Sequence, residues 1–350
     1  MKLAIFLPNW VGDLVMATPA LRAIRRHLGR SARILGILRP QLAELLAGTE
    51  WLDEHWCFDP RGRRFKWSRL ALVARMRRAR PDVALLLTNS LHTALLAWLG
   101  GAKERVGYVR YSRGPLLTEK LYPLRDAAGL RPVPMVDYYL ALARAIGCPV
   151  ESPRLELAVT EAERRQGERI WKTLGLRTDG RVVALNSSGA YGAAKLWPTE
   201  HCATLARRIA GELDCDVLVL CGPGERRAAL EVVRLAACPR VFTLPEDTIS
   251  LSSTKACLAR SRLLVSTDSG PRHIAAALDK PVITLLGPTL PDWIHNPTVA
   301  GSTLRVELDC LGCGKRTCPL RHHRCMRELR PQRVLEEVAA VLGGRLVEAA

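Results

Sequence analysis

The stretch LLVSTDSGPRHIAAAL, residues 263–278, decides the fold of this chain. Its first four residues, 263–266, form a short, mostly apolar run that predicts a buried parallel strand. A helical pattern follows from Gly270, where the glycine lets the backbone come close to a ligand. A helix that starts in this way offers free N–H groups and positive dipole character to an anion. The stretch therefore predicts a pyrophosphate-binding turn within an α/β fold.

The same alternation of apolar runs and amphipathic stretches continues along the whole chain. It predicts a doubly wound α/β fold, and its two consecutive sets predict two Rossmann-like domains. Proline-containing breaks at 148–160 separate the two sets. We expect domains at 1–155 and 156–330, with a helix in 331–350 that packs back on the first domain. The predicted strands are Leu3–Leu7, Arg33–Leu38, Val83–Leu87, Val182–Leu185, Val217–Leu220, Leu263–Ser266 and Val282–Leu286.

The chain is strongly basic, and the excess is concentrated in its first half. Its 350 residues include 52 Lys and Arg against 34 Asp and Glu, a net charge of +18. Residues 1–150 hold 24 basic and 11 acidic residues, and residues 151–350 hold 28 basic and 23 acidic residues. Such a field favours an anionic partner, such as nucleic acid, lipid head groups or a phosphorylated sugar. An arginine-rich coding background is the alternative explanation.

Cysteine usage and hydropathy bear on the location of the protein. Eleven cysteines in a long chain without a convincing export signal do not indicate a disulfide framework. The apolar start at residues 3–7 is too short for a signal peptide. The most apolar stretch, 84–99, contains a polar cluster that would be buried in lipid if it crossed a membrane. We expect a cytoplasmic protein that at most rests on a membrane surface.

Chemically suited side chains follow the ends of three predicted strands, where ligands of open α/β sheets bind. Asp13 follows the first strand, either as a helix cap or as a carboxylate that projects into the cleft. Ser187 and Ser188 follow the strand at 182–185, and Lys195 lies beyond them in a loop of small residues. From there Lys195 can reach a phosphate as a point charge.

The third strand end is Asp268-Ser269-Gly270, at the start of the helix described first. The helix dipole contributes only about 0.3–1 kcal/mol to anion binding, so Lys195 and nearby hydroxyls must add to it. His273 lies one turn further on. We group it with this site and interpret it as a packed or hydrogen-bonded histidine rather than as a general base.

Together these motifs resemble a known family, the ADP-heptose:lipopolysaccharide heptosyltransferases. The resemblance runs over nearly the whole chain and is closest to the heptosyltransferase II branch. The matching segments are 12–21, AKLWP at 194–198, DSGPRH at 268–273, AAAL at 275–278, Lys280-Pro281 and Gly287-Pro288-Thr289.

The resemblance implies a GT-B glycosyltransferase, with two Rossmann-like domains that face each other across a cleft. The first would bind the acceptor and the second the nucleotide sugar. Asp13 would be the general base, Lys195 and Asp268 would contact ADP-heptose, and Glu225 would contact the ribose. At 186–188 the chain departs from many relatives. The donor-binding residues are then Ser187, Ser188, Lys195, Glu225, Asp268, Ser269, Gly270 and His273.

The implied activity is inverting transfer of heptose from ADP-L-glycero-D-manno-heptose to the inner core of lipopolysaccharide. A positioned carboxylate contributes about 10²–10⁴-fold as a general base. Donors preset against the diphosphate stabilise charge as it develops. We find no Asp-x-Asp motif on a suitable loop, so we expect that no metal cofactor is required.

The acceptor would be the anionic core at the inner membrane surface, which gives the basic first domain a purpose. Each basic side chain is, taken alone, equally well explained as a solvated surface charge. The candidate acceptor-binding residues are Arg61, Arg63, Arg64, Lys66, Arg110 and Arg113.

Four cysteines gather near the end of the chain: Cys310, Cys313, Cys318 and Cys325. Four thiols within sixteen residues favour a structural zinc site in a cytosolic protein. Their spacing is not that of two standard Cys-x-x-Cys arms, and related heptosyltransferases can carry cysteines here.

Two other functions stay open at this level. A GT-B enzyme could use another donor, as UDP-sugar transferases and epimerases do, because the sequence does not reveal the adenine pocket. A basic nucleic-acid-binding protein with a zinc knuckle is the non-enzyme alternative. Aromatic residues make up only 5% of the chain and we find no recognition motif, so we expect no nucleic-acid partner.

Overall fold

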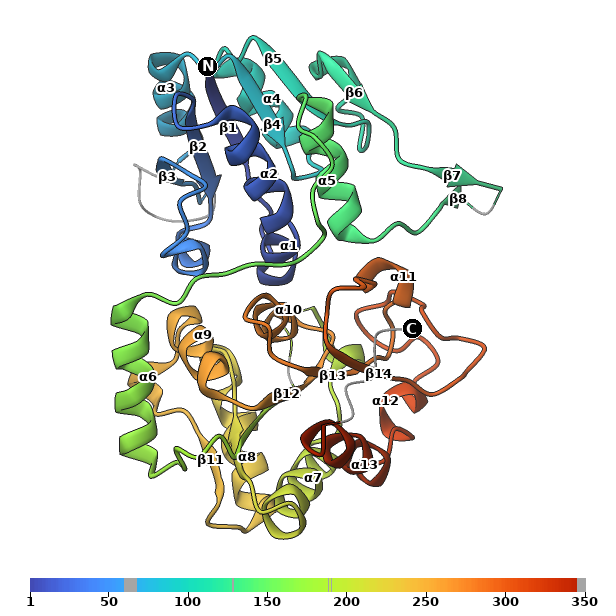
Figure 1. The fold of residues 1–350 in the computed structure, drawn as a ribbon. Coiled ribbons are helices and arrows are strands. Elements are labelled where there is room, and N and C mark those ends of the chain that lie inside the picture. Colours follow the sequence, from blue (N-terminus) through green and yellow to red (C-terminus); the bar gives the residue numbers. More distant parts are fainter. Residues whose placement is uncertain (60–67, 128, 188, 190, 345–350) are drawn as a thin grey trace. The chain divides into compact units, whose positions relative to one another are not determined.

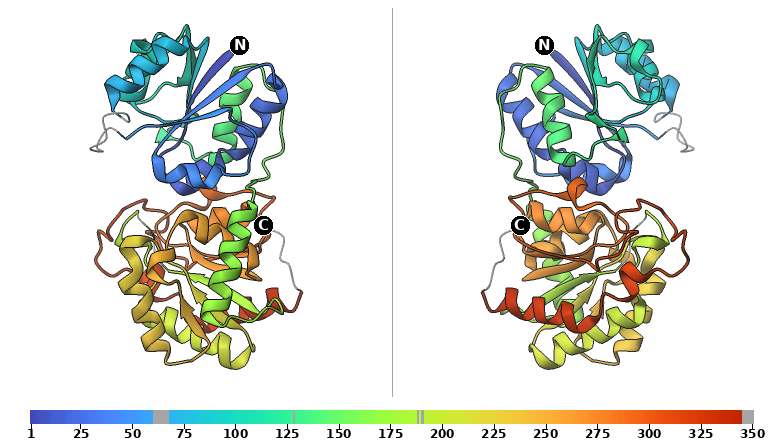
Figure 2. Two further views of the ribbon diagram at one scale, coloured as in Figure 1. Left: turned by 90° about the vertical axis from the view of Figure 1, so that its left-hand side faces the viewer. Right: turned by 90° about the vertical axis from the view of Figure 1, so that its right-hand side faces the viewer.

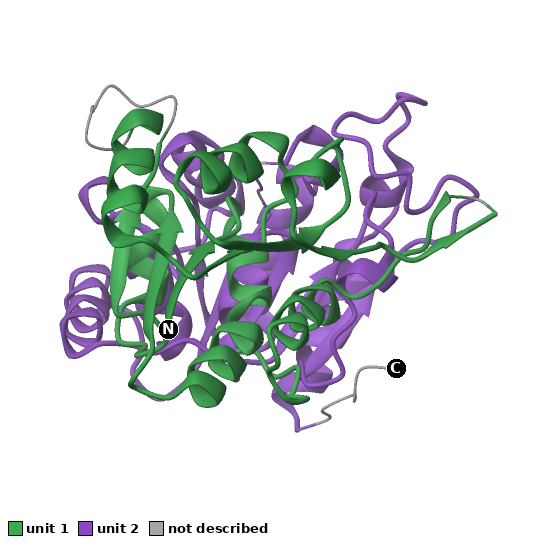
Figure 3. Ribbon diagram, turned by 90° about the horizontal axis from the view of Figure 1, so that it is seen from above, with its two compact units in different colours: residues 1–155 green, residues 156–350 purple. Residues whose placement is uncertain are grey.

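The computed structural model describes residues 1–59, 68–127, 129–187, 189 and 191–344. The chain divides into two compact units, Met1–Leu155 and Glu156–Ala350, which Figure 3 colours separately. Each unit has its own six-stranded sheet and its own apolar core.

The sheet of the first unit has the strand order β3-β2-β1-β4-β5-β6, and all neighbouring strands are parallel. Its central strands are almost fully buried apolar runs, as expected when helices cover both faces of a parallel sheet. The order reverses between β1 and β4, which opens a crevice beyond their carboxyl ends. The strands are β1 (Lys2–Phe6), β2 (Arg33–Leu38), β3 (Glu54–Cys57), β4 (Val83–Leu86), β5 (Glu104–Tyr108) and β6 (Glu119–Leu121).

Helices cover both faces of this sheet (Figure 1). On one face α3 and α4 pack over strand residues such as Phe6 and Leu86. On the other face α2 packs against α5. The α-helices are α1 (Val11–Met16), α2 (Thr18–Leu28), α3 (Arg69–Ala79), α4 (Leu91–Leu99) and α5 (Met135–Ala145), with the 3₁₀ helices η1 (Pro40–Leu46) and η3 (Gly114–Leu116). A small antiparallel pair, β7 (Arg125–Asp126) and β8 (Gly129–Leu130), lies before α5.

The second unit repeats the same strand order, as β11-β10-β9-β12-β13-β14, again with all neighbours parallel. Its reversal lies between β9 and β12. The prediction of two doubly wound sheets is therefore confirmed. The strands are β9 (Val182–Asn186), β10 (Asp216–Val219), β11 (Val241–Thr243), β12 (Leu263–Thr267), β13 (Val282–Leu285) and β14 (Gly301–Leu304).

The helices of the second unit form two layers around its sheet, as the two side views in Figure 2 show. One layer contains α7, α8 and α13, whose apolar residues share a core with the sheet. The other contains α6, α9 and α10. The α-helices are α6 (Glu161–Leu174), α7 (Thr199–Glu212), α8 (Arg226–Ala236), α9 (Leu251–Arg260), α10 (Gly270–Ala277), α11 (Pro291–Ile294), α12 (Arg324–Arg327) and α13 (Pro331–Leu342); the 3₁₀ helices are η4 (Ala193–Lys195), η5 (Pro223–Glu225) and η6 (Glu246–Thr248).

The terminal helix α13 differs from the expectation that it packs back on the first unit. It lies against α7, β13 and β14 of the second unit. Its apolar stripe of Val334, Leu335, Val338 and Val341 is buried in the core of that unit. Burial of this stripe, which recurs at helical spacing, is the physical reason for its position.

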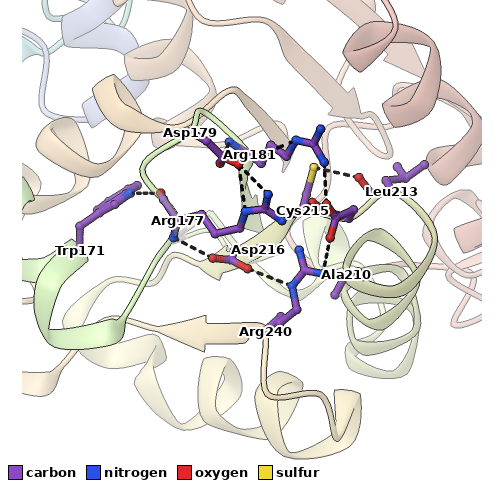
Figure 4. Close-up of polar contacts among 10 residues, drawn as sticks. Trp171, Arg177, Asp179, Arg181, Ala210, Leu213, Cys215, Asp216 and Arg240 are labelled. Atoms are coloured by element: carbon purple, nitrogen blue, oxygen red, sulfur yellow. Dashed lines mark hydrogen bonds and ion pairs between the residues drawn. The ribbon is translucent and has the colours of Figure 1, made fainter.

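The amino ends of β9, β10 and β11 carry a cluster of paired charges (Figure 4). Asp214 accepts from the guanidinium groups of Arg177 at 3.0 Å, Arg181 at 2.6 Å and Arg240 at 2.8 Å. The hydrogen bonds from Arg177 and Arg240 lower the pKa of Asp214 to about 2. Asp216 completes the cluster by accepting from the Arg177 main chain at 2.9 Å. Because its charges are satisfied among themselves, this edge of the sheet is a structural feature.

Among the described residues, no helix is both long enough and apolar enough to cross a membrane.

Candidate functional site

The candidate site of the second unit lies at the carboxyl ends of β9 and β12, where the strand order reverses. The Lys195 ammonium lies 2.5 Å from the Asp268 carboxylate and 3.1 Å from the main-chain oxygen of the same residue. Thr289 donates its hydroxyl to the same carboxylate at 2.8 Å. Lys195 comes from η4 and Asp268 directly follows β12. The structure thus brings two predicted residues together.

Burial and neighbouring charges determine the protonation of Asp268 and of His273 beside it. Burial alone would raise the pKa of Asp268, but the charges of Lys195 and Arg272 outweigh it and hold the pKa well below its usual range. Burial, together with the charge of Arg272, lowers the pKa of His273. At neutral pH the Asp268 carboxylate is therefore ionised and the His273 imidazole is neutral. This agrees with the interpretation of His273 as a packed histidine, since it is only 5% exposed.

Helix α10 begins beside the ion pair. Its N-cap residue, Ser269, has an extended backbone, and no side chain caps the first turn. The Ser269 hydroxyl instead accepts from the Asn186 amide at 2.9 Å, which ties the helix start to the end of β9. Main-chain N–H groups from Gly270 onward then point out of the helix beside Lys195. Such a combination suits the binding of a phosphate or diphosphate.

Two other predicted donor-binding residues, Ser187 and Glu225, make hydrogen bonds away from this pair. The hydroxyl of Ser187 shares a hydrogen bond with the buried thiol of Cys202. Glu225 is half-buried after β10, where its carboxylate accepts from the Gly222 N–H at 2.7 Å and holds its own turn. Ser188 lies outside the described residues. The ion pair and the start of α10 therefore form the centre of this site.

The first unit places Asp13 in the first turn of α1, beyond the carboxyl end of β1. The Tyr139 hydroxyl, from α5, donates a hydrogen bond to the Asp13 carboxylate. Tyr139 is 3% exposed, and burial together with the nearby Asp13 charge raises its pKa well above the usual value. The Asp13 side chain itself is half-buried. The Asp13 side chain is thus tied to α5 by the buried Tyr139 hydroxyl.

Arg113 is the clearest correction to the predicted acceptor site. It is fully buried, and its guanidinium donates to the main-chain oxygens of Tyr108 at 2.8 Å and of Thr88. A third donor reaches the Asn89 side chain at 3.0 Å. Because Arg113 joins the ends of β4 and β5 from inside, it is a structural residue and does not contact an acceptor directly.

The remaining acceptor candidates divide into two groups. Arg110 is half-buried, and its guanidinium lies 5.1 Å from the ring centroid of Tyr111, which is 65% exposed. It stays a candidate for contact with an anion. Arg61, Arg63, Arg64 and Lys66 lie outside the described residues.

The four predicted zinc ligands are near one another. Cys310, Cys313 and Cys318 each contribute, after burial, to raising the pKa of the Cys325 thiol to about 11. In the described parts of the chain, however, no group of three or more His, Cys, Asp or Glu side chains is placed to hold a metal ion. The predicted zinc site is therefore without geometric support.

A separate cavity of about 450 Å³ lies near the start of α7, and none of the candidate residues lines it. One of its arginines, Arg324, is already paired with Glu328 at 2.5 Å. We therefore assign the ligand site to the β9–β12 edge instead.

Sequence reasoning overlooked several residues of these sites. Thr289 belongs to the Gly287-Pro288-Thr289 motif that follows β13, so its place after a strand end indicated that it could lie at the donor site. Tyr139 is far from Asp13 along the chain and carries no local signal. Tyr191, whose ring centroid lies 4.7 Å from the Lys195 ammonium, precedes Lys195 in the same loop, so its proximity was a usable signal.

Known proteins share both the sequence and the fold. Residues 69–323 match glycosyltransferase family 9 (heptosyltransferase). Lipopolysaccharide heptosyltransferase 2 of Salmonella typhimurium is 27% identical over 98% of this chain and 99% of its own length. The structure of the E. coli ADP-heptose lps heptosyltransferase II is 25% identical, with a TM-score of 0.76 over 98% of both chains. E. coli heptosyltransferase WaaC with ADP has a TM-score of 0.71 at 17% identity, over 97% of this chain and 99% of its own. This chain therefore belongs to glycosyltransferase family 9, the heptosyltransferases.

Proposed function

We propose that this enzyme is a heptosyltransferase II-like, inverting glycosyltransferase that moves heptose from ADP-L-glycero-D-manno-heptose to the inner core of lipopolysaccharide. The observation that carries the proposal is the Lys195–Asp268 pair beside the uncapped start of α10. Relatives named lipopolysaccharide heptosyltransferase 2 align over almost the entire chain, which supports the same activity.

In this proposal the second unit binds the donor. Lys195 and the N–H groups at Ser269 and Gly270 receive the diphosphate, and Asp268 keeps the ammonium in place through its carboxylate. As the bond between the anomeric carbon and the diphosphate oxygen breaks, negative charge grows on ADP. Donors already aimed at that oxygen stabilise the charge without reorganisation. A homologue of the same fold has been solved with ADP.

The first unit supplies the base. Asp13 removes the proton of the acceptor hydroxyl as its oxygen forms the new bond to the anomeric carbon. The bond to ADP breaks on the opposite side, so the configuration inverts in a single displacement. Tyr139 orients the carboxylate by donating a hydrogen bond to it. The proton ends on Asp13 and is released to water.

The acceptor in this proposal is anionic and reaches the enzyme at the cytoplasmic face of the inner membrane. Among the described residues, Arg110 is the candidate for contact with this acceptor. The net charge of +18 attracts the anionic acceptor at longer range. The reaction as written needs no metal cofactor, because Lys195 and the helix start provide the positive charge.

A transfer assay tests the proposal. Purified enzyme is mixed with ADP-heptose and a core acceptor that lacks the next heptose, and the product is examined by mass spectrometry and for its anomeric configuration. We expect the gain of one heptosyl residue with inversion, and at least about a hundredfold slower product formation by the Asp13→Asn enzyme. Transfer from a UDP-sugar but not from ADP-heptose would favour the alternative donor and reject the proposal.

A further inference from the structure

The segment between β14 and α12 is an irregular loop of the second unit (Figure 1). We call residues 308–323 the cysteine loop. Its Gly314 N–H donates to the Pro288 oxygen at 2.7 Å, next to Thr289. Its Arg316 oxygen accepts from the Ala194 N–H at 3.0 Å, next to Lys195. The cysteine loop therefore touches both loops that reach the Asp268 carboxylate.

The contact with the Lys195 loop is close and specific. The Tyr191 hydroxyl donates to the Gly314 oxygen at 2.6 Å, and a His323 ring nitrogen lies 2.9 Å from the Ala194 oxygen. A Cβ atom added to Gly192 would come within 2.4 Å of the Arg316 oxygen, so only glycine permits this approach. The main chain at Arg316 is thus fixed relative to Lys195.

This packing gathers two cations around one aromatic ring. The Lys195 ammonium lies 4.7 Å and the Arg316 guanidinium carbon 5.4 Å from the centroid of the Tyr191 ring. Lys195 is paired with Asp268, whereas no carboxylate in the described part of the chain forms an ion pair with Arg316. The cation–π contacts hold both groups in place but neutralise neither. An anion bound beside Lys195 would supply the missing negative charge.

We propose that Arg316 is a donor-binding residue that contacts the diphosphate, and that Tyr191 positions it together with Lys195. This inference rests on the proposed function and names a further contact of the same site. Arginine suits the role because its planar fork can hold two phosphate oxygens at once. The side chain of Arg316 is exposed, so a ligand can reach it, and its main chain is hydrogen-bonded to the Lys195 loop.

Calorimetric titration of the full chain with ADP, inorganic pyrophosphate and adenosine tests the proposal. Arg316→Gln removes the charge but keeps the main-chain contact with Ala194. We expect it to weaken ADP and pyrophosphate binding by about tenfold, the loss of one charge-assisted contact, and to leave adenosine binding unchanged. Lys315→Gln is the matched control, because it removes the same charge from the neighbouring exposed position, and it should change ADP affinity less than about twofold.

Two further variants separate contact from positioning. Arg316→Lys should recover part of the affinity, since it restores the charge without the fork. Tyr191→Phe keeps the ring but loses the bond to Gly314, and we expect a rise in KM for the donor with little change in kcat. Equal effects of Arg316→Gln and Lys315→Gln, or no effect of Arg316→Gln while wild-type protein binds ADP, would overturn the inference and leave the proposed function intact. If wild-type protein bound neither ADP nor pyrophosphate, the proposed function itself would fail, and this inference with it.

Discussion

The two sheets of this protein share one strand order, yet the carboxyl ends of their strands carry opposite chemistry. In the first unit the ends of β4 and β5 are joined by the buried Arg113, and the half-buried carboxylate of Asp13 follows β1. In the second unit the same edge presents the Lys195–Asp268 pair and an uncapped helix start. Shared topology therefore supplies the crevice, and the residues that follow each strand decide whether it suits a hydroxyl acceptor or a diphosphate.

The largest effect should come from Asp13. Asp13→Asn keeps the shape of the side chain but removes the base, so turnover should fall by at least about a hundredfold, within the 10²–10⁴ range of general-base catalysis. ADP affinity should not change, because the donor site belongs to the other unit. Initial rates and calorimetry on the same preparation measure both quantities. A parallel loss of ADP affinity would break the assignment of one role to each unit.

Arg113 should matter for stability rather than for binding. Arg113→Ala removes the buried guanidinium that donates to two main-chain oxygens, and it leaves the Asn89 side-chain oxygen with the Tyr138 hydroxyl as donor. We expect a loss of about 2–4 kcal/mol in the free energy of unfolding of the first unit. Hydrogen exchange of the β4 and β5 amides reports on this unit alone.

Arg110→Ala is the matched control for Arg113, because Arg110 is partly exposed. It should leave amide exchange unchanged and raise KM for the core acceptor. If instead Arg113→Ala kept normal exchange rates and changed only acceptor KM, the predicted contact of Arg113 with the acceptor would be restored.

Replacement of Lys195 should weaken ADP binding, whereas replacement of Asp13 should slow turnover. Lys195→Ala should weaken ADP binding by about tenfold or more, since a charge-assisted contact is lost and the negative Asp268 is left facing the diphosphate. Isothermal titration at two salt concentrations measures the change and its electrostatic part. An unaltered ADP affinity would move the diphosphate site away from the β9–β12 edge.

The smallest effect concerns pH and the second unit. The pKa values of Asp268 and His273 are both lowered by folding, so the unfolded chain binds more protons in acid. Stability should fall as pH drops below about 6.5, the unfolded value for histidine, with a further loss below about 4. Thermal midpoints at pH 7 and pH 5 should therefore differ less for His273→Gln than for wild type. An identical pH dependence would show that His273 does not titrate in this way.

The sequence predicted more of the second unit than of the first. Strand ends and a glycine-containing helix start are local signals, which is why Asp268, Ser269 and Lys195 could be grouped before their contacts were known. Arg110 and Arg113 lie three residues apart in one irregular segment, and only tertiary packing decides which of them is buried.

Other features depend on contacts between distant parts of the chain. Tyr139 reaches Asp13 from α5, and Tyr191 contacts the cysteine loop more than a hundred residues later. The position of α13 likewise depended on which unit offered an apolar groove. The cysteine spacing predicted a zinc site, but spacing does not determine where side chains converge.

Selective binding of ADP at the Lys195–Asp268 site is tested most directly by calorimetric titration with ADP and with UDP in parallel. The titrations are made in EDTA on wild-type, Asp13→Asn and Lys195→Ala protein. We expect wild-type and Asp13→Asn protein to bind ADP equally, at least about tenfold more tightly than UDP, and Lys195→Ala to lose most of this binding. EDTA should make no difference, because no metal takes part in the proposed site. A preference for UDP, or binding of neither nucleotide, would contradict the assignment of this protein as an ADP-heptose-dependent transferase.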